Sequence, residues 1–285
     1  MQYELVAEAY RDLEQVTGRL ALIERLAALL AQTPAALLPQ VCYLCQAQVA
    51  PEFADVELGV AERLAAPAVA TATGASAAQV LAALQATGDL GQAAEQLLAD
   101  PAVGGAADRS ASLQVGVVVE TLHQIARAEG AGSQARKLAL LVGLVGRATP
   151  LEARYLLRLV TGTLRLGVGT PTILDALAAV YAGGRAARPV LERAYNSCCD
   201  LGLVAQTLVE GGLEAVEAMQ VRPGNPVRAM LAQRLSDASE ILQRLGGVCA
   251  AEYKYDGVRV QAHLTADGAV ELYTRRLSHV ATQFP

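Results

Sequence analysis

The first 218 residues carry apolar side chains at the three- and four-residue spacing of amphipathic helices, and this spacing constrains the fold more than any other feature. Between Arg11 and Gln32, leucine, valine and isoleucine follow this period, and Thr33-Pro34 ends the run. No segment before residue 215 alternates as a strand does. We therefore expect residues 1–218 to form one irregular helical domain, without the fixed repeat of a solenoid.

Further helices are indicated by the same spacing at about 36–49, 56–66 and 112–128. A capping box, in which a hydroxyl residue precedes a Glu or Gln by three positions, marks two helix starts. One pairs Ser76 with Gln79, and the other is Thr149-Pro150-Leu151-Glu152. Thr170-Pro171 indicates another start, and Gly183-Gly184 the corresponding end.

The character of the sequence changes after residue 218. Residues 221–226 have the Pro, Gly and Asn content of a linker, and a short helix is expected over 236–245. Apolar and polar residues then alternate over 258–264 and again from Val270, on either side of Ala266-Asp267-Gly268. This pattern predicts a β-hairpin, which is not stable by itself. We therefore expect a mainly α protein in which residues 219–285 are the truncated start of an α+β domain.

Several protein classes are disfavoured by composition. The longest apolar run, Leu138–Gly146, is too short to span a bilayer, and the N-terminus lacks the basic and apolar regions of a secretion signal. A cytoplasmic protein is expected. Cys42 and Cys45 form a CxxC pair that could indicate zinc or a redox site, but no second pair and no nearby His accompany it. Buried free thiols are the favoured interpretation.

Charge is unevenly distributed along the chain, although the net value is −5. Residues 1–126 carry 5 basic and 14 acidic side chains, whereas residues 127–193 carry 10 basic and 4 acidic ones. A basic segment within an acidic chain is typical of a phosphate-facing surface, but it is equally compatible with ordinary solvated arginines. The charge pattern alone leaves both interpretations open.

Lysine is nearly absent, because 21 of the 23 basic residues are Arg and only Lys137 and Lys254 are Lys. A lysine amine can lose its proton and act as a nucleophile, whereas a guanidinium cannot. Lys254 opens the sequence Lys-Tyr-Asp-Gly and is flanked by Tyr253 and Tyr255, where partial desolvation could free its lone pair. On these residues alone, an exposed lysine in a turn is the favoured interpretation.

The wider sequence resembles a known family. The run EYKYDGVRVQAHL, residues 252–264, and the following ELYTRRLSHVATQFP, residues 271–285, resemble the first motifs of ATP-dependent DNA ligases. Upstream, Gly132-Ser133-Gln134, the segment 164–169 and Asp200-Leu201-Gly202 resemble the same family in the same order. The resemblance covers most of the chain and is strongest to the branch with a helical DNA-binding domain before the adenylation domain.

The resemblance implies a three-step reaction with ATP and Mg²⁺ on nicked double-stranded DNA. Lys254 would attack the α-phosphate of ATP and form a lysyl-AMP, from which AMP passes to the 5′-phosphate of the nick before the 3′-OH displaces it. Glu252 would read the adenine, with Tyr253 beside it, and Arg259 would lie near the ribose or the phosphates. Arg275 would help to hold the nucleotide or the 5′-phosphate. His263 is expected on a strand face rather than as a general base.

The resemblance also implies that residues 1–218 form the DNA-binding domain and residues 219–285 the beginning of the adenylation domain. The expected DNA-binding positions are Ser133, Lys137, Arg165, Gly167 and Gly169. Glycines beside an arginine let backbone N–H groups approach phosphates closely, although helix capping and close packing would equally account for them. Metal ligands are expected beyond residue 285, so these 285 residues alone are expected to be inactive. We expect a monomer with no membrane association, and a sliding clamp is a candidate partner.

Two other interpretations remain. The chain could be a non-catalytic DNA-binding fragment with a vestigial nucleotidyltransferase motif, or a helical protein-interaction module with a coincidental Lys254 motif. Thr274-Arg275 matches a Ser-Arg pair of the family, but Leu277-Ser278-His279 stands where the family has an acidic residue after that pair. Ala229 also replaces a usual Pro.

Overall fold

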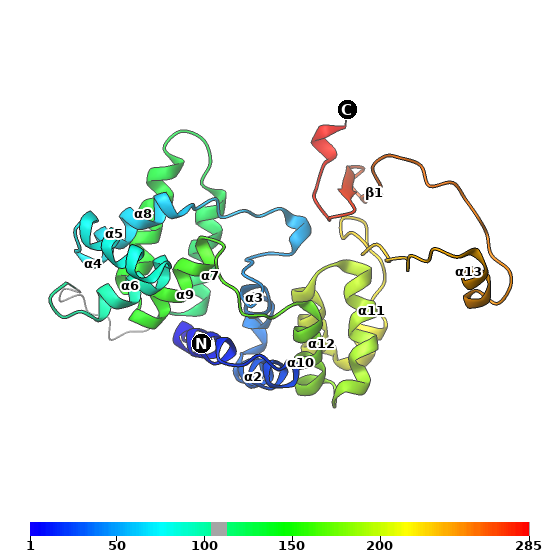
Figure 1. Cartoon of the computed structure of the whole chain (residues 1–285), viewed down its shortest axis with the longest axis horizontal. Coiled ribbons are helices and arrows are strands. Elements are labelled where there is room, and N and C mark those ends of the chain that lie inside the picture. The colour runs from blue at the N-terminus through cyan, green and yellow to red at the C-terminus, as the bar shows by residue number, and fades with distance from the viewer. Residues whose placement is uncertain (104–112, 285) are drawn as a thin grey trace.

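The chain folds into two helical lobes followed by an extended segment and a hairpin (Figure 1). The structure, a computed structural model, describes residues 1–103 and 113–284. Among these it contains thirteen α-helices and two strands, which confirms the prediction of a mainly α fold. Residue 112, the expected start of one helix, and Pro285, the last residue of the expected second domain, lie outside the described residues.

The first lobe packs α6 on α9, α4 on α8, and α1 against α9. Its helices are α1 (Tyr3–Glu14), α4 (Glu62–Thr73), α5 (Ala77–Thr87), α6 (Leu90–Ala99), α7 (Val115–Arg127), α8 (Ser133–Arg147) and α9 (Pro150–Val160). The second lobe packs α2 on α10, and α12 on both α3 and α11. Its helices are α2 (Arg19–Gln32), α3 (Leu38–Leu44), α10 (Thr170–Tyr181), α11 (Arg188–Cys198) and α12 (Leu201–Glu217).

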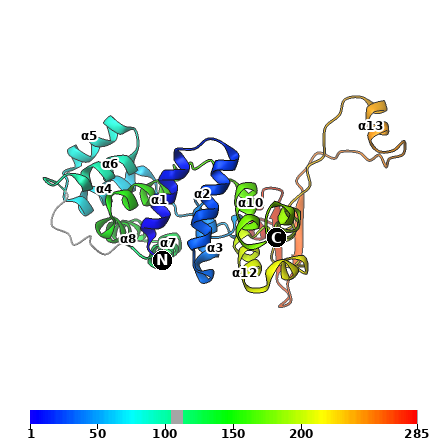
Figure 2. The same cartoon turned by 90° about the horizontal axis from the view of Figure 1, so that it is seen from below.

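Three segments connect the lobes: residues 15–18, 45–61 and 161–169. Beyond α12, the chain is extended except for α13 (Ala238–Arg244), which stands apart from both lobes in Figures 1 and 2. The hairpin then pairs β1 (Val260–Leu264) with β2 (Val270–Thr274) in antiparallel register, Val260 opposite Thr274. Within the described residues no single helix is both long and apolar enough to cross a bilayer; α4 and α5 together have the required length and composition but are bent by 118°.

Local signals placed several helix ends correctly. Both predicted capping boxes are present, since the hydroxyls of Ser76 and Thr149 accept the N–H groups of Gln79 and Glu152, whose side chains reach back. The predicted helix over 236–245 is α13, and Asp267-Gly268 lies in the hairpin turn, as predicted. Cys42 and Cys45 are buried free thiols, as predicted. Burial raises the pKa of the Cys45 thiol to about 12, which keeps it protonated and unreactive.

Two helix predictions were wrong. The run from Arg11 to Gln32 is two helices, because the chain leaves α1 at Gln15 and re-enters a helix only after Gly18, which is extended. The helix expected at 56–66 begins only at Glu62. In the preceding loop, Asp55 ends the 3₁₀ turn at 52–54 with a left-handed backbone conformation, φ 52°. Gly59 is also left-handed, with φ of 58°, so the loop does not continue as a helix.

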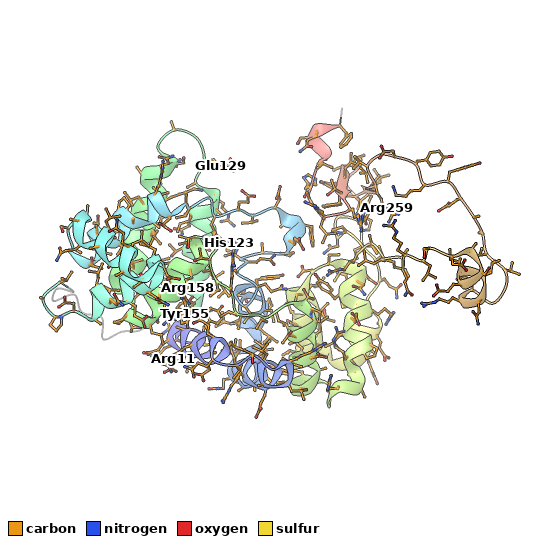
Figure 3. All side chains as sticks on the ribbon, viewed as in Figure 1. Arg11, His123, Glu129, Tyr155, Arg158 and Arg259 are labelled. Atoms are coloured by element: carbon orange, nitrogen blue, oxygen red, sulfur yellow. The ribbon has the colours of Figure 1, made fainter. Side chains whose placement is uncertain are left out.

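An ion-pair network joins three helices of the first lobe. Arg158 on α9 forms an ion pair with Glu14, the last residue of α1. It forms a second one, at 2.8 Å, with Asp89, the N-cap residue of α6. Arg154 reaches the same Glu14 at 3.0 Å, and the Tyr155 hydroxyl donates to it at 3.0 Å. Figure 3 shows Arg158 and Tyr155 together on α9, facing α1. Gly91 lets α6 approach α9 closely, because a methyl group at this position would collide with the Arg154 carbonyl of α9.

Replacing Arg158 by Met should therefore lower the free energy of unfolding by about 2–3 kcal/mol, since it leaves the Glu14 and Asp89 carboxylates partly buried without their main partner. The matched control is Arg11→Met, because the Arg11 side chain is 46% exposed against 11% for Arg158 and its carboxylate contacts are 3.8–4.0 Å long. That change should cost less than about 1 kcal/mol. Urea unfolding followed by circular dichroism measures both, and equal losses would contradict the assignment.

Candidate nucleic-acid and nucleotide sites

The expected DNA-binding residues fall in two places. Ser133 and Lys137 lie in the first two turns of α8, whereas Arg165, Gly167 and Gly169 lie in the segment that connects α9 to α10. Lys137 contacts the loop 55–61, whereas no hydrogen bond joins Arg165, Gly167 or Gly169 to this loop among the described residues. This loop and the end of α9 line a surface groove of about 550 Å³, at Leu58, Gly59, Thr161 and Gly162 among others.

Lys137 binds that loop directly. Its ammonium donates to the Leu58 carbonyl at 2.8 Å, and a methyl group on Gly59 would lie only 2.9 Å from the same nitrogen. A hydrogen bond from a charged donor is among the stronger ones in proteins. The structure thus gives Lys137 a partner within the chain that the sequence did not reveal, and part of its binding capacity is used to hold the loop.

The connecting segment 161–169 carries one basic side chain, that of Arg165. Arg165 is exposed and makes no ion pair or side-chain hydrogen bond within the part of the chain that the structure describes, whereas the flanking Leu164 and Leu166 are buried. Gly167 has a φ of +67°, which favours glycine. Gly169 caps α10, and its carbonyl accepts the N–H groups of Thr172 and Ile173. Arg165 is therefore a free cation at the boundary between the lobes.

The basic segment 127–193 is less available than its charge suggests. Arg154 and Arg158 pair with Glu14, Glu95 and Asp89, which belong to the acidic first part of the sequence. Arg188 pairs with Asp175 and Glu192. Much of the apparent excess is thus neutralised inside the helical lobes. Arg127, Arg147, Arg165 and Arg185 have neither an ion pair nor a side-chain hydrogen bond among the described residues, whereas Arg136, Lys137 and Arg193 each donate to a backbone carbonyl. The first four are the cations available for an external phosphate.

The expected nucleotide-binding residues lie at or next to an exposed extended segment. All side chains from residue 242 to 259 are exposed, including Glu252, Lys254 and Arg259. Tyr253 and Tyr255 are each 86% exposed, so the expected desolvation of Lys254 by its neighbours is not found. Figure 3 places Arg259 close to the hairpin. Arg275 follows β2 in a tight turn, in which Leu277 has a φ of 65°, and it is also exposed. The described residues bring these groups into no enclosed pocket.

No group of three or more His, Cys, Asp or Glu residues within 1–103 and 113–284 could hold a metal ion. The described residues supply a candidate nucleophile and several cations. A nucleotide bound here would need further groups around its phosphates, because phosphoryl transfer depends on charge placed around the reacting phosphorus.

Sequence analysis missed the residues that attach the hairpin to the rest of the molecule. Gln261 and His263 on β1 and Tyr273 on β2 face inward and bind the backbone of residues 224–227. The polar half of the alternating pattern was the available signal, but an alternating strand is usually taken to bury its apolar half. The expectation that His263 is a strand-face residue agrees with its position.

Comparison with known proteins identifies the class. The family described as "DNA ligase N terminus" matches residues 2–178, and the "ATP dependent DNA ligase domain" matches residues 229–285. The whole chain is 46% identical to "DNA ligase 2" of Thermofilum pendens, 43% to a "DNA ligase" of Cenarchaeum symbiosum and 42% to a "Probable DNA ligase" of Aquifex aeolicus. In each case it covers 48% of the relative, so the chain spans about half the length of the curated relatives it matches. The chain belongs to the ATP-dependent DNA ligase family.

If Lys137 holds the loop, Lys137→Met should free it. Backbone NMR order parameters over residues 56–61 should fall, because the loop loses the charge-assisted hydrogen bond to the Leu58 carbonyl. The matched control is Arg136→Met, which removes the same charge one residue away but leaves the Leu58 contact, because Arg136 donates to the Glu129 carbonyl. Unchanged order parameters in the Lys137 variant would show that the loop is held by other contacts.

Proposed function

We propose that this chain forms the DNA-binding domain, residues 1–218, and the beginning of the adenylation domain, residues 219–285, of an ATP-dependent DNA ligase that seals nicks in double-stranded DNA. One observation carries the proposal: the family matches at 2–178 and 229–285 occur in this order, and Lys254 of the Lys-Tyr-Asp-Gly sequence lies within the second. The roles of the individual residues and the domain boundary rest on the resemblance, and the roles of Lys254 and Arg165 are tested below.

In the proposed reaction, the Lys254 amine attacks the α-phosphorus of ATP, so a P–N bond forms, the bond to pyrophosphate breaks and the amine gives up its proton. An oxygen of the 5′-phosphate at the nick then attacks the phosphorus of the AMP, and the P–N bond to Lys254 breaks. Finally the 3′-OH loses its proton and attacks the phosphorus of the 5′-phosphate, which joins the strands and releases AMP. Magnesium would neutralise phosphate charge during these steps. Glu252 and Tyr253 would contact the nucleotide base, and Arg259 and Arg275 the ribose or phosphates, since planar guanidinium groups suit phosphate oxygens.

In the helical lobes, the proposal assigns phosphate contacts to Arg165 and to the backbone N–H groups around Gly167 and Gly169. It also places Ser133 and Lys137 at the DNA, with Lys137 acting partly through the loop that it holds. The support is the exposed, unpaired Arg165 beside two glycines on a segment that connects the two lobes. A monomer and recruitment by a sliding clamp remain predictions from the resemblance.

One observation favours a second candidate, a DNA-binding protein without catalysis. Lys254 lies among exposed side chains, and exposure gives the amine none of the desolvation that activates a lysine nucleophile. The two candidates share DNA binding and differ in covalent chemistry at Lys254.

Adenylation tests the enzymatic proposal. The complete gene product, incubated with Mg²⁺ and ATP labelled at the α-phosphate, should acquire one AMP that peptide mass spectrometry locates on Lys254. Lys254→Arg should abolish the label, because an arginine is not a nucleophile at neutral pH. Lys137→Arg is the matched control and should keep it, since Lys137 is the other lysine of this sequence. The 285 residues alone should remain unlabelled. Label on the Lys254 variant would contradict the proposed nucleophile.

DNA binding is tested on the 285-residue chain. Arg165→Met should weaken binding to a nicked duplex and lower the slope of log affinity against log salt by about 1, since one phosphate contact is lost. Arg185→Met is the matched control, because Arg185 is an exposed, unpaired arginine just beyond the opposite end of α10. Fluorescence anisotropy at several salt concentrations measures both. Equal losses would indicate a diffuse charge effect instead of a contact at Arg165.

A further inference from the structure

Residues 219–237, between α12 and α13, contain no helix or strand, and their Pro, Gly and Asn content is typical of a flexible connection. Part of this connection is nevertheless held on both sides. Residues 224–228 lie between the inner face of the hairpin and the C-terminal end of α11, and hydrogen bonds reach them from each.

On the hairpin side, Gln261 binds Val227 twice. Its side-chain oxygen accepts the Val227 N–H at 2.9 Å, and its amide nitrogen donates to the Val227 carbonyl at 2.7 Å. This is the pairing that a neighbouring strand would provide, here supplied by one side chain. His263 Nδ1 accepts the Gly224 N–H at 3.0 Å, and the Tyr273 hydroxyl donates to the Gly224 carbonyl at 2.8 Å. Both backbone groups of two linker residues are therefore satisfied by the hairpin.

On the helical side, the anchor is the last turn of α11. The Arg228 N–H donates to the Asn196 carbonyl at 2.8 Å, and the Asn225 side chain donates to the Cys198 carbonyl at 3.4 Å. The Arg228 guanidinium lies 3.3 Å from the Tyr195 hydroxyl and 5.7 Å from the centre of its ring. The last carbonyls of a helix have no hydrogen-bond partner within the helix, and these donors supply one to Asn196 and Cys198.

The burial pattern of the hairpin follows from this attachment. Tyr273 is buried and Gln261 and His263 are half-buried, whereas Leu264 and Val270 on the opposite face are 67% and 56% exposed. Burying the Gln261 amide and the His263 imidazole is favourable only if their hydrogen bonds are made. The polar face of the hairpin therefore fits the observed backbone of residues 224–227 and few other arrangements. Phe53, from the second segment that connects the lobes, adds an edge contact to the Tyr273 ring at 6.1 Å.

We propose that residues 224–228 are a latch, clamped by Gln261, His263 and Tyr273, that fixes the orientation of the hairpin on the second lobe. Gln261 is its principal positioning residue. The latch converts a flexible connection into a fixed one and so restricts where the segment that carries Lys254 can reach. The proposal concerns how the parts are held together and does not depend on ligase activity.

The first test is amide hydrogen exchange at single residues in the 285-residue chain. Gln261→Met keeps the side-chain length and removes both polar atoms. Exchange of the Val227 N–H should become faster by about tenfold or more, while the Arg228 N–H, held by α11, should change little. The matched control is Gln283→Met, because the Gln283 side chain is exposed and has no hydrogen bond among the described residues. Equal Val227 exchange in all three proteins would overturn the clamp.

The second test measures the distance between the parts. Spin labels at Asp267→Cys in the hairpin turn and Glu210→Cys on α12, with Cys249→Ser removing the exposed native thiol, report on their separation. A narrow distribution is expected in the parent, and a broader one in both Gln261→Met, which removes both bonds to Val227, and Arg228→Met, which removes the guanidinium contacts with Tyr195. Gln283→Met should stay narrow. A broad distribution in the parent, or a narrow one in both latch variants, would overturn the proposal.

Discussion

Glu14 occupies the position on which the arrangement of the lobes depends. It is the last residue of α1, and Arg154, Arg158 and Tyr155 of α9 all converge on its carboxylate. The chain leaves α1 directly afterwards, turns through residues 15–18 and enters α2, which packs on α10 of the second lobe. Because α1 is held to the first lobe at its final residue, the short turn has little freedom, and the direction of α2 follows. A charged network at such a junction specifies geometry more effectively than it adds stability, because its partners must all be present together.

The same network explains the uneven charge along the sequence. Residues 1–126 are strongly acidic and residues 127–193 strongly basic, which suggests separate acidic and basic surfaces. In the structure, acidic side chains of the first part, Glu14, Asp89 and Glu95, meet Arg154 and Arg158 of the second inside one lobe. Charges distant in sequence thus neutralise each other in space. A smaller set of exposed arginines remains available to an external polyanion. Among them, Arg165 lies on a segment that connects the two lobes.

Sequence reasoning succeeded where the determining interaction is local. A capping box spans four residues, so both at Ser76 and Thr149 could be read directly, and the Lys254 motif is a contiguous string. Sequence-based prediction failed where a residue distant in the sequence determines the local structure. Residues 56–61 have helical spacing, yet Lys137, far along the chain, binds the Leu58 carbonyl and the backbone turns at Gly59. The hairpin was predicted from its alternation, but which face is covered depends on a linker some 35 residues earlier, and no local pattern shows that Gln261 will pair with Val227.

The latch and the candidate nucleophile constrain each other. Lys254 precedes Gln261 by seven residues, and an extended chain of that length spans at most about 25 Å. The latch therefore limits the region that the amine can explore without fixing its position, whereas catalysis requires placement within about 0.5 Å. The remaining order has to come from contacts that the exposed segment 242–259 does not make within the described residues. A bound nucleotide is suited to that role, because Glu252 and Arg259 would contact it on either side of Lys254. Ordering by substrate would then couple formation of the proposed site to the presence of ATP, while the latch keeps the segment close to the second helical lobe beforehand.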